Sequence, residues 1–202
     1  MWGRAAPQCG AGLSGPPYLM RVEDLNALDP DTAARELLQC CGSSRWARQM
    51  AASRPFASCE QLIASADRYW GGLDRADWLE AFAAHPKIGG GGVDGARRAG
   101  SDQRRAKAER EAAQDWSAQE QAGVAGAADA TLQRFANLNR DYEARFGYIF
   151  IVCATGKSVA EMLDLLERRI GHDPDTEVRI AADEQRKITH LRLMKLLDGR
   201  QD

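Results

Sequence analysis

The chain has 202 residues and a formal net charge of −2 at pH 7, which suits a single domain that is long enough to bury a core. This near-neutral balance creates no basic field for nucleic acid or anionic membranes, and no stretch reaches the roughly 18 apolar residues of a membrane-spanning helix, so neither partner is expected. The five cysteines form no Cys-x-x-Cys pair, which is typical of reduced thiols and leads us to expect a cytoplasmic protein.

The first half of the chain shows a short irregular segment followed by helical patterns. Residues 1–19 are rich in Gly and Pro without helical periodicity, so we expect a disordered extension. Met20, a possible translation start, is the expected beginning of a helical domain that extends to residue 202. The helices expected here follow from capping residues and apolar spacing: one capped by Asp31 and burying Ala34, Leu37, Leu38 and Cys41, one over Ser43–Ala52, one capped by Ser58 with Gln61, and one from Asp74 to about Phe82.

The second half begins with a break at Pro86 and the glycine run Gly89–Gly92. The helical segments expected after it are a charged one over 101–114, one capped by Ser117 with Glu120, one through Leu132 and Tyr142, one capped by Ser158 with Glu161, and one from about Asp175 to Leu197. Tyr148–Ala154 is apolar and is either a strand or an extended link. The pattern predicts an all-α, single-domain, compact bundle of about eight to ten helices.

Two segments imitate phosphate-binding loops. Gly90–Gly95 fits G-x-G-x-x-G, but it follows a helix instead of a buried strand, which favours a plain loop. Gly156-Lys157-Ser158 matches the end of a P-loop, yet Ile151 stands where its first glycine belongs. A helix cap at Ser158 is the favoured interpretation, and a nucleotide-binding protein that uses this loop stays as the alternative.

Among the histidines, His85 is the candidate for chemistry. The three histidines, His85, His172 and His190, form no H-x-x-x-H pair, so no metal site is predicted. His85 stands at a helix end before Pro86, where an imidazole can change protonation near neutral pH. It can equally be a simple helix-dipole cap, just as Arg192 can be a surface ion pair.

A set of short motifs follows one another along the chain in a defined order. Its members are Cys41-Gly42-Ser43, Arg54-Pro55-Phe56, Trp78-Leu79-Glu80-Ala81-Phe82, His85-Pro86-Lys87-Ile88-Gly89, Ser117-x-x-Glu120-Gln121-Ala122-Gly123, Arg145-Phe146-Gly147-Tyr148, Glu184-x-x-Lys187-Ile188 and Arg192-Leu193. From about Met20 to Leu197 this order resembles the family of 2-oxo-4-hydroxy-4-carboxy-5-ureidoimidazoline (OHCU) decarboxylases. Single pieces are weak signals, whereas the ordered set is specific.

The resemblance implies an all-α homodimer that needs no metal or organic cofactor. It implies conversion of OHCU to (S)-allantoin and carbon dioxide in uric acid degradation. The family's functional residues fall on His85, Glu120 and Arg192 as catalytic residues, and on Pro86, Ser117, Gln121, Ile149 and Ile151 as substrate-binding residues. A non-catalytic helical interaction module that keeps the fold is the remaining alternative.

The residue types suit a decarboxylation in which the substrate's own ring accepts the electrons. We expect His85 to move the proton, Glu120 to orient the imidazole or hold the ureido group, and Arg192 to pair with a carboxylate or oxyanion. Ser117 and Gln121 would hold polar atoms of the ring and ureido group. The rate is expected to depend on a group with a pKa of roughly 6.5, shifted by its neighbours.

Overall fold

The computed structural model describes residues 20–86 and 129–198. Within these two ranges the chain forms eight α-helices and no strand, which confirms the all-α prediction. The helices are α1 (Val22–Ala27), α2 (Pro30–Cys41), α3 (Ser44–Ala52), α4 (Cys59–Gly71), α5 (Arg75–Ala83), α7 (Asp129–Phe146), α8 (Val159–Arg169) and α9 (Pro174–Asp198). The expected extension 1–19, the glycine run, the charged segment 101–114 and the cap at Ser117 lie outside the described residues.

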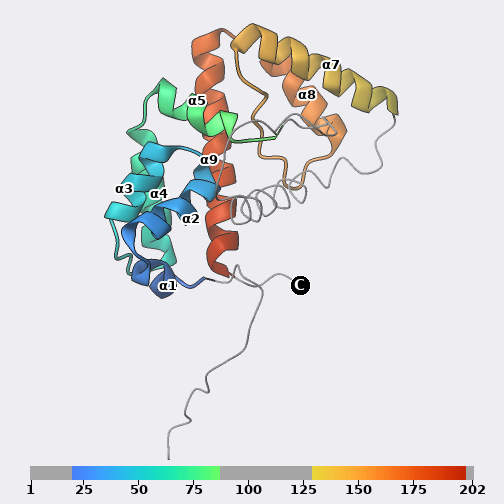
Figure 1. Ribbon diagram of the computed structural model, residues 1–202. Helices are drawn as coiled ribbons and strands as arrows, with labels where there is room; N and C mark the ends of the chain where they lie inside the picture. Colours follow the sequence, from blue (N-terminus) through green and yellow to red (C-terminus); the bar gives the residue numbers. More distant parts are fainter. Residues whose placement is uncertain (1–19, 87–128, 199–202) are drawn as a thin grey trace, which may run out of the picture.

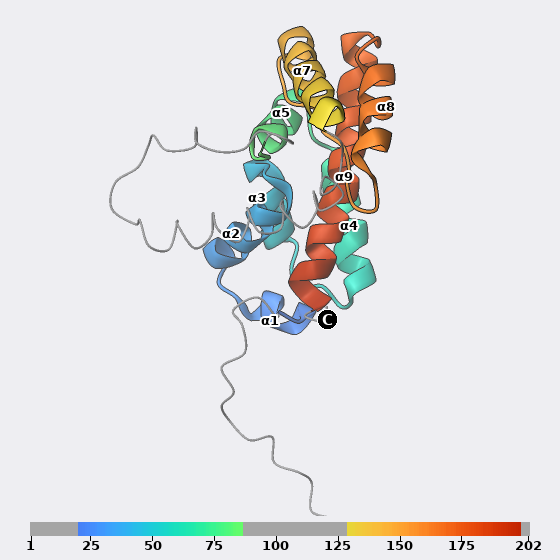
Figure 2. The same ribbon diagram turned by 90° about the vertical axis from the view of Figure 1, so that its right-hand side faces the viewer.

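The long helix α9 is the axis of the molecule. Figure 1 shows α1–α4 along one side of it and the α7–α8 pair on the other, with α5 between them near the top. Figure 2, turned by 90°, shows α7 and α8 lying next to each other beside the upper part of α9. Two indole N–H groups form hydrogen bonds between helices. Trp46 of α3 donates to the carbonyl of Ala66 of α4 at 3.1 Å, and Trp70 of α4 donates to that of Ala182 of α9 at 3.1 Å.

Most helix starts are where the capping signals predicted them. Ser43, Ser58, Asp74 and Ser158 each accept a hydrogen bond from a backbone amide in the first turn of α3, α4, α5 and α8. For α2 the prediction was wrong by two residues, because Asp29 is the cap and accepts from the amide of Thr32 at 2.9 Å. Pro30 then takes the first helical position, where its missing N–H costs nothing, and Asp31 lies inside the first turn.

The buried face of α2 also differs from the predicted one. Leu37 and Cys41 are buried as expected, but Ala33 and Cys40 complete the stripe, Ala34 is half-buried and Leu38 is 36% exposed. Both α3 and α9 pack on α2, and Ala33, Leu37 and Cys40 are fully buried. The apolar spacing allowed two adjacent faces, and the neighbouring helices decide between them.

The ends of α2 and α5 come very close at Gly42. This residue ends α2 in the left-handed region, with φ +84°, and its amide donates to the carbonyl of Leu38 at 2.8 Å. A Cβ added at Gly42 would lie 2.6 Å from Cβ of Ala84 and 3.1 Å from the carbonyl oxygen of Ala81. Glycine is therefore required both for the turn and for this approach, which fixes the end of α5 immediately before His85.

The apolar segment between α7 and α8 is an extended link. Residues from Phe150 to Ala154 are buried, yet none of the described residues pairs with them as a strand. The sequence left a strand and a link open, and the structure selects the link. Of the helices described, none combines the length and apolar character that crossing a membrane requires.

Candidate active site

His85 directly follows the C-terminus of α5. The helix ends at Ala83, and the amide of His85 still donates to the carbonyl of Phe82 at 3.1 Å. The side chain of Glu80 holds this helix to α3 by accepting from the hydroxyl of Ser44 at 2.6 Å and from its amide at 3.1 Å. Together with the contact at Gly42, these bonds give His85 a defined place beside α9.

The imidazole of His85 is close to two side chains of α9, those of Gln185 and Arg192. Burial, and then the positive charge of Arg192, lower the pKa of His85 to about 3, while the interaction with Gln185 acts in the opposite direction. The residue is partly exposed, but its Nε2 atom is buried. In the free protein the ring is therefore uncharged at neutral pH.

This corrects the expectation that His85 changes protonation near neutral pH. The expectation assumed that the imidazole is exposed to solvent. In the structure, desolvation and a neighbouring cation both disfavour the charged ring. The same finding weakens the interpretation of His85 as a dipole cap, since a neutral ring has no charge to offer the C-terminus of α5.

Arg192 is a buried cation, with an exposed fraction of 6%. The interpretation as a surface ion pair is therefore wrong. Its charge also acts on the thiols of Cys40 and Cys41 at the end of α2, where burial outweighs it and raises the pKa of Cys41 to about 12. Both thiols stay protonated at neutral pH, so they are not candidates for the nucleophile.

The extended link reaches the same end of α5. The ring of Phe82, one turn before His85, lies 5.2 Å from that of Tyr148, centroid to centroid. Ile149 follows directly and is half-buried, and Ile151 is buried. The amides of Ile149 and Ile151 find no acceptor among the described residues.

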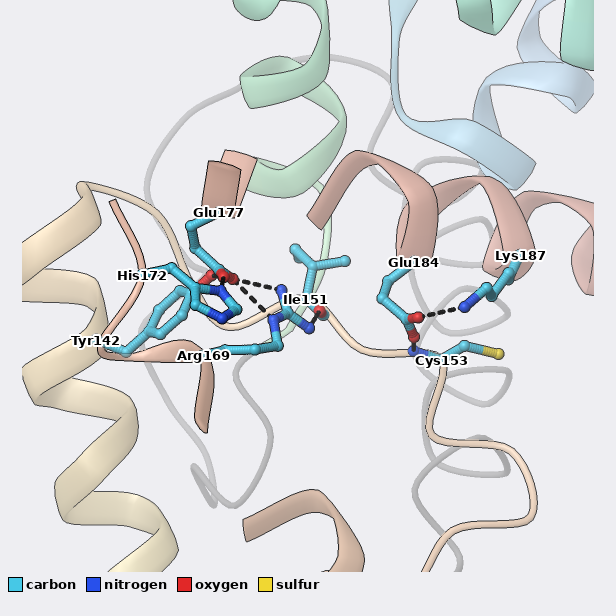
Figure 3. Close-up of polar contacts among 8 residues, drawn as sticks. All are labelled: Tyr142, Ile151, Cys153, Arg169, His172, Glu177, Glu184 and Lys187. Carbon is cyan, nitrogen blue, oxygen red and sulfur yellow. Dashed lines mark hydrogen bonds and ion pairs between the residues drawn. The ribbon is translucent and has the colours of Figure 1, made fainter. Parts of the chain in front are cut away.

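A buried ion-pair network holds the link from its other side (Figure 3). Arg169 donates from Nη1 to the carbonyl of Ile151 at 2.8 Å and from Nε to Glu177 at 2.8 Å. Glu177 is fully buried and also meets Nδ1 of His172 at 2.8 Å and the hydroxyl of Tyr142. The carboxylate of Glu177 thus gathers partners from three segments around the link.

The Glu184-x-x-Lys187 motif holds the next part of the link (Figure 3). Glu184 accepts from the amide of Cys153 at 2.8 Å and from Lys187 at 2.5 Å. Burial opposes the charge of this carboxylate, but these two hydrogen bonds together keep the pKa of Glu184 below its ordinary value. The motif therefore positions backbone, which the sequence alone did not indicate.

The loop Gly156-Lys157-Ser158 is occupied by its own contacts. Lys157 donates to the carbonyl of Cys153 at 2.6 Å, and the hydroxyl of Ser158 donates to Glu161 at 2.8 Å in a capping box. These contacts agree with the predicted cap, and they give the side chains of both Lys157 and Ser158 partners within the protein. Among the described residues, no group of three or more His, Cys, Asp or Glu side chains is arranged to hold a metal ion.

The predicted site residues divide into three groups. His85 and Arg192 come together, with Pro86 exposed beside them. Ile149 and Ile151 lie in the link that packs on the same helix end. Ser117, Glu120 and Gln121 lie outside the described residues, so their place in the site stays a prediction.

Sequence reasoning missed Gln185, which is fully buried next to His85. It shares one face of α9 with Thr189 and Arg192, at spacings of four and then three residues. Three polar side chains on the buried face of a helix are unusual. That pattern is a signal that could have identified Gln185.

Comparison with known proteins identifies the family of the chain. Residues 26–194 match the OHCU decarboxylase family. The chain is 40% identical over 166 residues to the uric acid degradation bifunctional protein TTL of Arabidopsis thaliana, covering 80% of this chain and 46% of that protein, so it spans about half of that relative. It is 31% identical over 144 residues to the OHCU decarboxylase of Amia calva, covering 71% of this chain and 75% of that protein.

A solved structure shows the same fold. The crystal structure of an OHCU decarboxylase in the presence of (S)-allantoin superimposes with a TM-score of 0.61 at 38% identity, covering 81% of this chain and 98% of that one. Family match, curated relatives and fold therefore agree. The chain belongs to the OHCU decarboxylase family and is a carboxy-lyase.

Proposed function

We propose that this decarboxylase converts OHCU to (S)-allantoin and carbon dioxide, with His85 as the acid–base group and Arg192 as the counter-charge of the substrate. The observation that carries the proposal is the buried cation of Arg192 beside an imidazole that burial, and then this positive charge, keep uncharged. A buried guanidinium favours an anion, and the carboxylate that OHCU loses is one.

Binding of that anion changes the state of His85. A carboxylate next to Arg192 offsets the positive charge that now disfavours the imidazolium, so the pKa of His85 rises in the complex. The neutral ring of the free protein is then a base that becomes stronger only when the substrate is present. Proton transfer is thereby coupled to substrate binding.

The chemical step needs one histidine and one proton from solvent. The bond between the ring carbon and its carboxylate breaks, and carbon dioxide leaves. The electron pair enters the ring towards the carbon that bears the ureido group. The hydroxyl on the carbon that loses carbon dioxide gives up its proton to become a carbonyl, and the ureido-bearing carbon gains a proton on one face. Because the carboxylate leaves as neutral carbon dioxide, the ring nitrogen that was double-bonded to the ureido-bearing carbon takes up one further proton, which comes from solvent. His85 takes the first proton and supplies the second, which is general acid–base catalysis at two positions of one substrate.

The remaining roles follow the family resemblance. Glu120 orients the imidazole or holds the ureido group, while Ser117 and Gln121 bind polar atoms of the substrate. Pro86 borders the site next to His85. The amides of Ile149 and Ile151 donate to substrate oxygens, and their lack of an acceptor among the described residues supports this.

The decisive experiment generates OHCU from urate in the assay cell. The purified protein should accelerate the decay of OHCU and produce the circular dichroism of (S)-allantoin. A folded chain that leaves the decay unchanged would favour a non-catalytic interaction module. Calorimetric binding of ATP, reduced by Lys157→Ala, would instead favour the nucleotide-binding alternative.

Three further properties belong to the proposal. Activity should survive dialysis against EDTA without added metal, nucleotide or pyridoxal phosphate. The protein should be a homodimer by light scattering. It should act in the cytoplasm, where reduced thiols such as Cys40 and Cys41 persist.

A further inference from the structure

The amide group of Gln185 has a fixed orientation. Its Nε2 donates to the carbonyl of Cys41 at 3.3 Å and to Oγ1 of Thr189 at 3.3 Å. The Cys41 carbonyl can only accept, and the Thr189 hydroxyl already donates its hydrogen to the backbone carbonyl of Gln185 at 3.0 Å. Both partners therefore require the nitrogen of the amide, and Oε1 must point to the other side.

Two buried polar atoms, one in this amide and one in His85, lack a partner among the described residues. Oε1 of Gln185 has no donor, and Nε2 of His85 has no hydrogen-bond partner, among the described residues. Both side chains belong to one contact region, because Cys41 binds Gln185 while Gly42 packs on Ala84, which precedes His85. A buried acceptor and a buried ring nitrogen without partners are each costly, and one bond between them satisfies both.

We propose that Gln185 is a positioning residue that sets the tautomer of His85: its Oε1 accepts from Nε2–H of the imidazole and leaves the lone pair on Nδ1 for the substrate. An amide oxygen cannot donate, so the nitrogen facing it must carry the hydrogen. The interaction of Gln185 with the ring, which raises the pKa of His85, agrees with this contact. The use of Nδ1 as the base rests on the proposed function, whereas the tautomer itself does not.

The test is the tautomer of His85, read by long-range ¹H–¹⁵N correlations in the full-length, ¹⁵N-labelled protein. The protein has three histidines, so His85→Asn assigns the signals. In the wild type, Nε2 should show the protonated shift and Nδ1 the unprotonated shift. In Gln185→Met the two tautomers should become mixed, because Met has a similar length but no acceptor oxygen of this kind.

Thr189→Val is the matched control. It removes one acceptor from the amide nitrogen of Gln185 within the same buried shell, but the Cys41 carbonyl still orients the amide. The wild-type tautomer should therefore persist. A wild-type His85 protonated on Nδ1 would overturn the proposal even if Gln185→Met fails to fold, and so would an unchanged tautomer in folded Gln185→Met.

Turnover gives an independent readout. Gln185→Met should lower kcat about 10- to 100-fold with little change in KM, the range that is typical of groups that orient metal-bound histidines. If His85→Asn keeps full turnover while the wild-type tautomer is as stated, the acid–base role fails and the positioning of the ring stands. If instead the wild-type ring is protonated on Nδ1 while His85→Asn loses turnover, the acid–base role stands and the positioning by Gln185 fails.

Discussion

Two buried polar clusters lie along α9, and they differ in the charge that lies beside their histidine. Around Glu177, the carboxylate meets Arg169 and His172 at 2.8 Å each, and it also accepts from the hydroxyl of Tyr142. Around His85, the buried Arg192 cation lies beside a ring that burial and this positive charge keep neutral.

This difference indicates which cluster supports the fold and which one carries the chemistry. A network whose charges compensate one another stabilises one arrangement of the chain, here the place of the link at Ile151. A buried cation beside an imidazole costs free energy whenever that ring binds a proton in the absence of ligand. Natural proteins retain such a cost chiefly where a ligand or a reaction uses it. We therefore assign the chemistry to the His85 cluster and the support of the link to the Glu177 cluster.

The largest expected effect is on turnover. His85→Asn removes the acid–base group but keeps a polar side chain, so kcat should fall about 10²–10⁴-fold while the free energy of unfolding at pH 7 changes little. Turnover of freshly generated OHCU and urea denaturation measure the two quantities. His190→Asn is the control. The ring of His190 lies 2.7 Å from the carboxylate of Asp67 and takes no part in the His85 cluster, so its loss should leave kcat unchanged. A His85→Asn protein as active as the control would assign no catalytic role to the ring.

The Glu177 cluster should respond in stability instead. Glu177→Gln leaves the buried Arg169 guanidinium without its counter-charge, which should cost about 3–5 kcal/mol of unfolding free energy. Asp175 lies in the first turn of the same helix and forms an exposed ion pair with Arg75 of α5. Asp175→Asn should cost less than about 1 kcal/mol of unfolding free energy. Equal losses in the two variants would mean that the buried network does not stabilise the fold as its pairing indicates.

These two clusters also show what sequence reasoning could and could not predict. Local signals placed the caps at Ser43, Ser58 and Ser158, because a cap depends on residues three positions apart. They misplaced the start of α2 and its buried face, since Pro30 and the neighbouring helices decide both. Local patterns thus define elements, whereas packing between distant elements selects among their faces.

The site shows the same limit more sharply. The family motif contexts singled out His85 and Arg192, and the structure brings these two residues together. The pKa of His85 was expected near neutrality, because the position of Arg192 and the depth of burial depend on how α5 meets α9. Gln185 and the Glu177 network escaped notice for the same reason, since their partners are far away in the chain.

The shifted pKa of His85 predicts a pH dependence of stability. In the unfolded chain the ring has a pKa of roughly 6.5 and binds a proton below that pH. In the folded protein it binds a proton only near pH 3. Between these values the unfolded state holds more protons, so stability falls as pH falls, by up to about 1.4 kcal/mol per pH unit for this group. From pH 7 to pH 5 the wild type should lose about 2 kcal/mol more than His85→Asn in urea denaturation. Parallel losses in both proteins would show that His85 titrates normally when folded.

The smallest effect is expected from Arg192→Lys, which tests the geometry of the cation and not its sign. A lysine keeps the positive charge but loses the planar pair of donors that matches a carboxylate. Because the buried position already excludes water, the loss of one charge-assisted hydrogen bond should raise KM about tenfold, with a smaller change in kcat. Arg134→Lys, at an exposed pair with Glu167, supplies the matched control and should leave KM unchanged. If Arg192→Lys lowers kcat at constant KM instead, the guanidinium acts on charge that develops during the reaction, and the substrate carboxylate is bound elsewhere.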